Sequence, residues 1–193
     1  FTLVELIVYT GLMLVVIALV AGIFGAALRG QRDIAATASG NNGGQLVAQS
    51  ISTGVRSATE ITVKTVSTTT QMLIVRTPGK AATAASRCQA WYFTTDNGGA
   101  VYSTTSTSSI PTPSAAQLAS WTRLATGITK SARSGAPSAM LTPDATPTKS
   151  VTFEWTMANP TGKPVLISSS ASTRQTVTGS TSCVGAHSSG PPA

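Results

Sequence analysis

Residues 6–28 contain no charged side chain and no proline, and this apolar run constrains the chain more than any other feature. A helix of that length spans about 35 Å at about 1.5 Å per residue. The hydrocarbon core of a bilayer is about 30 Å thick, so the run is long enough to cross a membrane. Arg29, Arg32 and Asp33 follow directly and mark a water-facing end. No other stretch is comparable, which excludes a multi-span membrane protein.

A secretory signal peptide is the alternative interpretation of this run. Such a peptide has positive charge before a short apolar core and a small-residue cleavage site after it. Here the sequence opens at Phe1 without a basic flank, and the apolar run is longer than a signal core. We therefore expect the segment to be retained as a transmembrane helix.

Glu5 is an acid among aliphatic residues at the start of this helix. A charge in a membrane is costly unless it is paired, neutralised or near the interface. One interpretation is that the helix dipole and the lipid headgroups stabilise Glu5 at the helix start. The other is that Glu5 meets a positive group on another chain. The nearest positive group is the α-amino group of Phe1, which a helix cannot easily fold back onto its own Glu5.

The run FTLVELI at residues 1–7, with an unbroken apolar helix behind it, resembles the mature N-terminus of type IV pilins and pseudopilins. In that family a prepilin peptidase cuts just before the residue that stands here as Phe1 and methylates the new amine. The resemblance implies that Glu5 pairs with the N-terminal amine of a neighbouring subunit during assembly. The chain departs from many pilins at Gly22, near which they carry a proline.

The resemblance also implies a function. The chain would be a structural subunit of a type IV pilus or pilus-like extracellular filament on the bacterial surface, polymerising by N-terminal helix bundling. It would sit in the inner membrane before assembly. Its partners would be copies of itself or other pilins, the prepilin peptidase and the pilus assembly platform. The alternative is a minor pilin or secretion pseudopilin at the filament tip, acting as an initiator, an adhesin or a DNA-binding receptor.

Small residues recur four apart inside the apolar run. Ala18, Gly22 and Ala26 form one row, and Ala21 and Gly25 form a second. Such rows let helix backbones approach closely in lipid. Small residues are also common in transmembrane helices, so chance spacing is the alternative. We expect these five positions to pack against other helices.

The chain divides into three parts by composition. Residues 1–28 are predicted to form the transmembrane or filament-core helix, and residues 29–58 its continuation. The cluster GNNGG at residues 40–44 disfavours helix and predicts a hinge, an unwound patch or a tolerated weak spot. Residues 59–193 are predicted to form a β-rich globular head, because Ser and Thr make up 55 of the 193 residues and Gly and Pro are frequent.

The second half of the helix carries its own apolar face. Val47, Ile51, Val55 and Ala58 recur at three to four residues, which is the spacing of a helix face that lies on a sheet. The fold class expected is therefore α+β, a long N-terminal helix packed on an antiparallel β-sheet. This layout is similar to the pilin fold.

Alternating or short apolar runs predict the strands of the head. The sequence Asp-Asn-Gly-Gly at residues 96–99 lies between two such runs and predicts a hairpin. Residues 104–114 and 131–149 are rich in Ser, Thr, Pro and Gly and are expected to be loops. The predicted strands cover residues 61–66, 72–75, 90–94, 100–103, 121–128, 151–157 and 165–168.

Cys88 and Cys183 are the only two cysteines. In a head outside the reducing cytoplasm such a pair is expected to be bridged, with two free buried thiols as the alternative. The bridge would attach the C-terminal segment, residues 176–193, to a central strand. Pilins often close a C-terminal loop with such a disulfide.

Side chains suited to catalysis or metal binding are few: one histidine, His187, and six acids. The chain has no C-x-x-C, H-E-x-x-H or phosphate-loop motif, so we expect no enzyme activity, no cofactor and no metal site. His187 lies in a Gly/Ser/Pro-rich tail and is expected to be a solvated loop residue. Asp96 and Asp144 lie in loops but lack the carboxylate density that calcium prefers.

The net charge of +7 is the remaining signal for a partner. Such a balance attracts DNA, acidic polysaccharide or anionic surfaces. The cations are scattered, however, and the only local groupings are Arg76, Lys80 and Arg87, and Lys130 and Arg133. A solvated basic surface is the expected interpretation, and contact with DNA or a surface ligand stays open.

Overall fold

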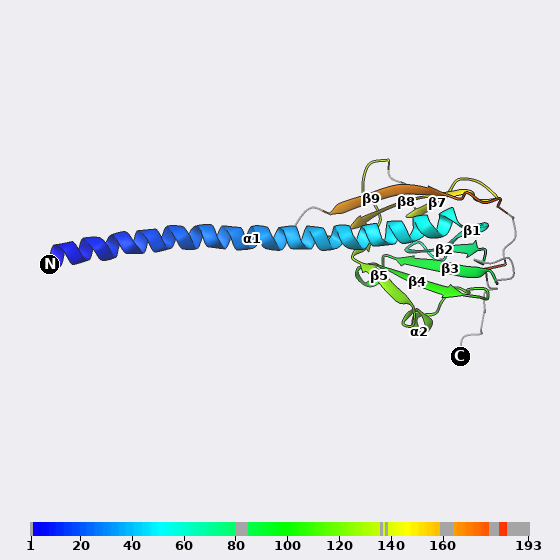
Figure 1. Cartoon of the computed structure of the whole chain (residues 1–193), viewed down its shortest axis with the longest axis horizontal. Helices are drawn as coiled ribbons and strands as arrows, with labels where there is room; N and C mark the ends of the chain where they lie inside the picture. Colours follow the sequence, from blue (N-terminus) through cyan, green and yellow to red (C-terminus); the bar gives the residue numbers. More distant parts are fainter. Residues whose placement is uncertain are drawn as a thin grey trace.

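A long helix that projects from a β-rich head dominates the computed structural model of the chain (Figure 1). The structure describes residues 2–79, 85–135, 137, 139–158, 164–177 and 182–184. Within them the fold is α+β, with one long N-terminal helix, antiparallel sheets and one disulfide. These features confirm the expected fold class.

Helix α1 (Leu3–Arg56) has 54 residues. It begins after Thr2, whose Oγ1 accepts a hydrogen bond from the backbone N–H of Glu5 at 3.3 Å. The helix is continuous through residues 40–44. Packing accounts for this continuity: Gly44 is buried, and a Cβ there would lie 2.7 Å from Cγ1 of Ile167. Gly43 and Gly44 thus lie where α1 meets the head, and tertiary contacts offset their poor helix propensity.

Five strands form the first antiparallel sheet, in chain order. They are β1 (Glu60–Thr65), β2 (Thr70–Thr77), β3 (Arg87–Thr94), β4 (Ala100–Ser106) and β5 (Thr122–Thr126). The predicted hairpin at residues 96–99 is confirmed: it joins β3 to β4 through a short 3-10 turn, η1 (Asp96–Gly98). Asn97, Gly98 and Gly99 have φ values of 51°, 84° and 73°, a left-handed conformation that Asn and Gly accommodate best.

A second antiparallel sheet is built around β8 (Ser150–Met157). Strand β9 (Val165–Ser172) pairs with one edge of β8, and β6 (Ile128–Thr129) and β7 (Leu141–Pro143) pair with the other. The strand predicted at residues 121–128 is therefore wrong as one unit. Gly127, at φ 79°, separates β5 from β6, and the two belong to different sheets. The loop predicted at residues 131–149 contains β7, which is only three residues long.

The main core lies between the inner faces of the two sheets, with the second half of α1 packed along it (Figure 1). Val47, Ile51, Val55 and Ala58 are fully buried, which confirms the predicted helix face. The largest side chains that they meet come from both sheets: Trp91, Phe93, Phe153 and Trp155. The side chain of Gln71 joins the sheets directly. It donates to the carbonyl of Leu141 at 3.2 Å and accepts from the N–H of Leu141 at 2.9 Å.

The disulfide between Cys88 and Cys183 joins residues 95 apart in the sequence, and their Cα atoms are 5.6 Å apart. Cys88 lies in β3, the central strand of the first sheet. The N–H of Ile110 donates to the carbonyl of Cys183 at 2.9 Å, and the three residues share a small core on the outer face of that sheet. The predicted bridge is confirmed.

Candidate functional site: the exposed apolar helix

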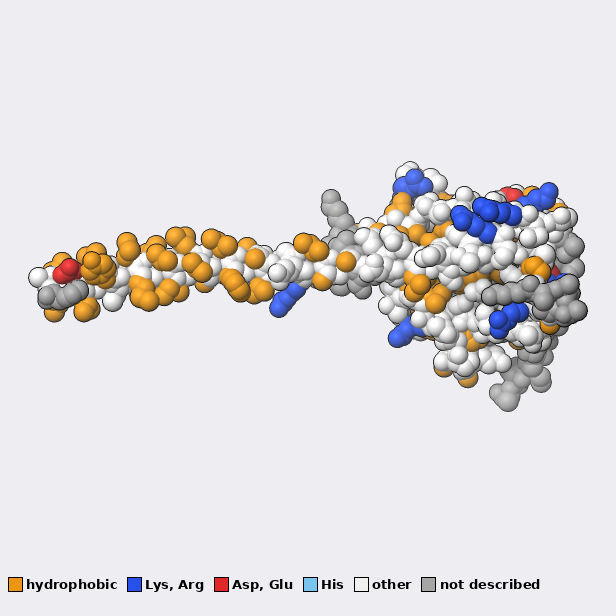
Figure 2. Space-filling view, in the orientation of Figure 1, with side chains coloured by type: hydrophobic (Ala, Val, Ile, Leu, Met, Phe, Trp, Pro, Cys, Tyr) orange, Lys and Arg blue, Asp and Glu red, His pale blue; other side chains and the backbone are white. Residues whose placement is uncertain are grey.

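The outer part of α1, Leu3–Arg32, is the most unusual surface of the molecule. It is long and apolar enough to span a membrane, and its most apolar stretch is not buried at all. Every large apolar side chain from Leu3 to Phe24 is between 51% and 78% exposed. Figure 2 shows these side chains along the whole visible face of the helix. A helix that is apolar all round is stable only inside a membrane or a bundle of other helices.

Glu5 is the one charged residue between Leu3 and Leu28, and it lies in the first turn of α1. The positive end of the helix dipole favours a negative charge at that position. Within the described part of the chain the one ion pair is between Arg133 and Glu154, so Glu5 has no charged partner there. Phe1, which the sequence singled out as the source of the partner amine and the methylation site, lies outside the described residues.

The small residues of the two predicted rows lie on this exposed helix. Ala18, Gly22 and Ala26 are free of tertiary contact, as are Ala21 and Gly25. A Cβ at Gly22 would meet nothing within 4 Å, and at Gly25 its nearest neighbour would be the Arg29 guanidinium of the same helix. The rows are thus available to another helix backbone. Their role in packing stays a prediction.

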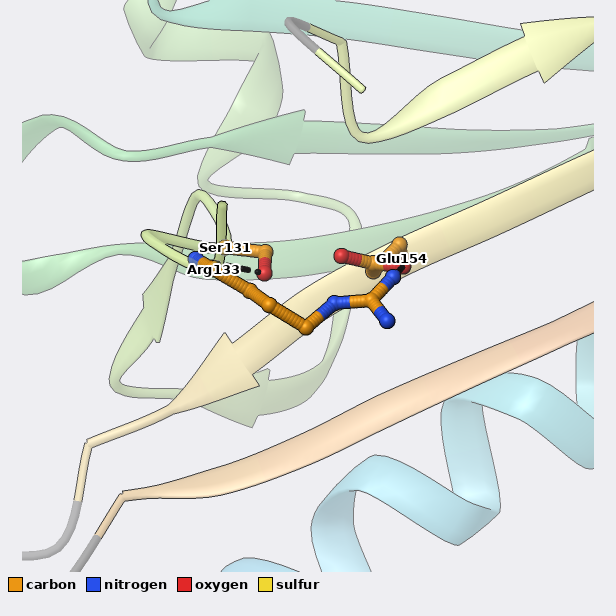
Figure 3. A network of polar contacts seen from close by, with 3 residues as sticks. All are labelled: Ser131, Arg133 and Glu154. Carbon is orange, nitrogen blue, oxygen red and sulfur yellow. Dashed lines mark hydrogen bonds and ion pairs between the residues drawn. The ribbon is translucent and has the colours of Figure 1, made fainter. Parts of the chain in front are cut away.

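The cations of the head are spread over the face in view in Figure 2 and do not gather in one patch. One predicted grouping is largely satisfied internally. Nη2 of Arg133 lies 3.0 Å from Oε2 of the buried Glu154, and Ser131 accepts from the backbone N–H of Arg133 (Figure 3). Nζ of Lys130 donates to the carbonyl of Thr68. The ion pair holds the loop after β6 against β8 and offsets the charge of Arg133.

The other predicted grouping is dispersed as well. Nε of Arg76 donates to Ser86 Oγ at 3.0 Å. Arg87 is exposed at the start of β3. Lys80 lies outside the described residues, as does His187.

The carboxylates of the two loop aspartates accept hydrogen bonds from the loops around them. Oδ1 of Asp144 accepts the backbone N–H groups of Ser150, Lys149 and Ala145 at 2.9–3.0 Å. These bonds, that from Ser150 foremost, lower the pKa of Asp144 below its ordinary value of 3.8. Asp96 Oδ2 accepts from two threonine hydroxyls. Within the described residues no three His, Cys, Asp or Glu side chains come together to hold a metal ion.

A hollow of about 320 Å³ lies on the outer face of the first sheet, and no sequence pattern indicated it. Tyr92, Tyr102 and Arg123 line it, together with the hairpin turn at Asp96. These residues come from three strands, and only the register of β3, β4 and β5 places them side by side. A single sequence carries no signal for such a register.

Comparisons of the chain with protein-family models, with curated proteins and with solved structures find no match. A long apolar N-terminal helix followed by a β-sheet is compatible with a pilin. The helix also suits insertion into a membrane as a single span.

Proposed function

We propose that the chain is a structural subunit of a type IV pilus-like extracellular filament, which polymerises by bundling the outer parts of its α1 helices. The observation that supports this most is the exposure of the apolar run at residues 6–28, while the first buried apolar side chain of α1 in the head is that of Val47. Such a surface needs an apolar cover. The inner membrane provides it before assembly, and neighbouring helices provide it in the filament.

Two features favour a filament subunit over a simple membrane anchor. The helix dipole favours an acid at Glu5 even in a simple anchor, but an anchor does not require one, and a charge within lipid is costly unless it is paired. A neighbouring subunit's N-terminal amine, which the FTLVELI motif implies is a methylated Phe1, is a suitable partner. The rows of small residues along the same helix allow the close backbone approach that a bundle requires.

Replacing Glu5 tests the proposal. In Glu5→Gln the side chain keeps its shape and loses its charge, and Glu5→Ala removes the carboxylate altogether. We expect both variants to lower the yield of sheared filaments at least tenfold, because a lost interaction of about 1.4 kcal/mol already changes an equilibrium tenfold. The thermal unfolding midpoint of the head should not change, since Glu5 contacts nothing in it.

Asp33→Asn is the matched control, because it removes an acid just beyond the apolar run. Its filament yield should equal that of the unaltered chain. Normal yield from Glu5→Gln would overturn the proposal. The abundance of the chain in the sheared fraction separates the main subunit, which dominates it, from a minor pilin or pseudopilin at the tip, which is present in traces.

A further inference from the structure

The hollow on the outer face of the first sheet has a built polar and aromatic lining. In the register of β3, β4 and β5, Tyr92 lies opposite Tyr102, and Tyr102 lies opposite Arg123. Directly opposite residues of an antiparallel pair share a face of the sheet, with their Cβ atoms about 5 Å apart. The three side chains therefore form a continuous row across the floor of the hollow.

An irregularity in β5 places the arginine in this row. Val101 is paired with Ala125 and Tyr102 with Arg123, so Leu124 is an extra residue that has no partner in β4. Without it, Leu124 and not Arg123 would lie opposite Tyr102. Bulges of this kind redirect side chains next to binding sites. Leu124 packs against the main core, while Arg123 is exposed and lines the hollow.

One end of the row, Tyr92, and the rim at Asp96 are held in place. Tyr92 makes an edge-to-face contact with Trp121, at a centroid distance of 6.3 Å. At the hairpin rim, Oδ2 of Asp96 accepts hydrogen bonds from Thr69 at 3.1 Å and Thr94 at 3.2 Å. The left-handed turn that follows is fixed by Gly99, where a Cβ would lie 1.8 Å from the carbonyl oxygen of Ile128. Tyr92 and the rim are therefore ordered before any ligand arrives.

Several polar atoms of this lining make no hydrogen bond within the described part of the chain. In the described part of the chain, no hydrogen bond engages the hydroxyl of Tyr92 or Tyr102, the guanidinium of Arg123, or Oδ1 of Asp96. They offer hydrogen-bond donors, acceptors and two aromatic rings around a space whose volume matches small-ligand pockets, which begin at about 300 Å³.

We propose that this hollow binds one neutral hexopyranose unit of a glycan. The apolar C–H face of the sugar packs on a tyrosine ring, which combines an apolar body with a polar tip. Asp96 Oδ1 accepts from a sugar hydroxyl, and Arg123 and the tyrosine hydroxyls donate to sugar oxygens. The proposal is independent of the filament, because the whole site lies within the head.

Charge balance favours a neutral ligand over a nucleic acid. Single-stranded nucleic acid is bound in grooves that are positive along their length. Here Arg123 stands with Asp96 around one hollow, so the local charges cancel and a phosphate meets a carboxylate at the rim. A neutral sugar has hydroxyls for both groups and meets no repulsion.

Saturation-transfer NMR on the full chain in detergent micelles tests the site. The probes are methyl β-D-galactopyranoside and methyl α-D-mannopyranoside, with sodium D-galacturonate and the oligonucleotide dT6 as competing chemistries. We expect transfer onto the ring C–H groups of a methyl hexopyranoside, with a dissociation constant on the order of 1 mM for so small a ligand. Arg123→Gln and Tyr102→Ala should weaken binding about tenfold or more.

Arg87→Gln is the matched control, since it removes an exposed arginine from the same sheet away from the hollow. It should leave binding unchanged. Arg123→Gln replaces an exposed side chain and keeps the fold, so the test does not depend on Tyr102→Ala folding. Absence of transfer to both hexopyranosides would overturn the proposal, as would transfer that Arg123→Gln does not alter. Preferential binding of galacturonate or dT6 would also overturn it, in favour of an anion site.

Discussion

Gly54 lies where α1 packs directly against the side chain of Trp91 in β3. A Cβ at this position would be 2.3 Å from Cη2 of the buried Trp91. One helical turn earlier, Ser50 Oγ accepts a hydrogen bond from Nε1 of Trp91 at 3.0 Å. The indole is therefore held against the helix by a hydrogen bond on one side and by the absence of a side chain on the other.

This contact makes Gly54→Ala and Gly43→Ala an informative pair. We expect Gly54→Ala to destabilise the head by about 1–3 kcal/mol, the usual cost of overpacking a core. At Gly43 the new methyl group would make ordinary contacts at 3.6 Å with Ala125, so the better helix propensity of alanine should stabilise the chain by up to about 1 kcal/mol. Denaturant unfolding measures both changes. Equal effects of the two substitutions would contradict the packing described at Trp91.

Individual residues were predictable where one local pattern determines their surroundings. The spacing of Val47, Ile51 and Val55 was enough to predict a buried helix face, and Glu5 is conspicuous in any apolar run. The row of Tyr92, Tyr102 and Arg123 was not predictable. It depends on strand register and on the extra residue Leu124, both of which tertiary packing decides.

At the scale of elements, the long helix and the main strands follow from hydrophobic periodicity. The structure departs from the sequence prediction where an element is very short or joins two layers. Strand β7 has three residues inside a Ser/Pro/Gly-rich segment, and it forms because Leu141 pairs with β8 and with the side chain of Gln71. Gly127 ends β5 and lets the chain cross to the second sheet.

The disulfide carries the prediction that belongs to this scale. It fixes the segment at residues 182–184, which makes a parallel bridge between Val184 and Ile110, onto the outer face of the first sheet. A closed loop of this length stabilises a chain by about 4–5 kcal/mol in the chain-entropy model. We expect the double variant Cys88→Ser with Cys183→Ser to lower the free energy of unfolding by about this amount. The denaturant midpoint should fall with it. An unchanged midpoint would contradict this prediction and would show that packing alone holds residues 182–184 on the sheet.

At the scale of the whole molecule, the chain consists of a head with a buried apolar core and a protruding helix whose apolar side chains are exposed. The core of the head draws on α1 only from Val47 onward. The apolar run before Arg29 contributes nothing to that core. Stability and assembly should therefore be separable.

A chain that begins at Gly30 tests this separation. We expect it to be monomeric without detergent and to unfold at the same midpoint as the full chain in micelles, because all buried core residues are retained. Analytical ultracentrifugation and calorimetry measure the two properties. A large fall in the midpoint would mean that the apolar run supports the head, and aggregation without detergent would mean that the head exposes an apolar surface of its own.

The position of α1 between the two sheets has a mechanical consequence. The helix contacts β9, β5, β8 and β2, and β8 and β9 run roughly along its axis in the view of Figure 1. A pull on the protruding end therefore loads these contacts together, in shear, and does not peel one strand away at a time. The two hydrogen bonds between Gln71 and Leu141 resist the spreading of the sheets that withdrawal of the helix requires. Tension applied along the helix is therefore shared by both sheets of the head.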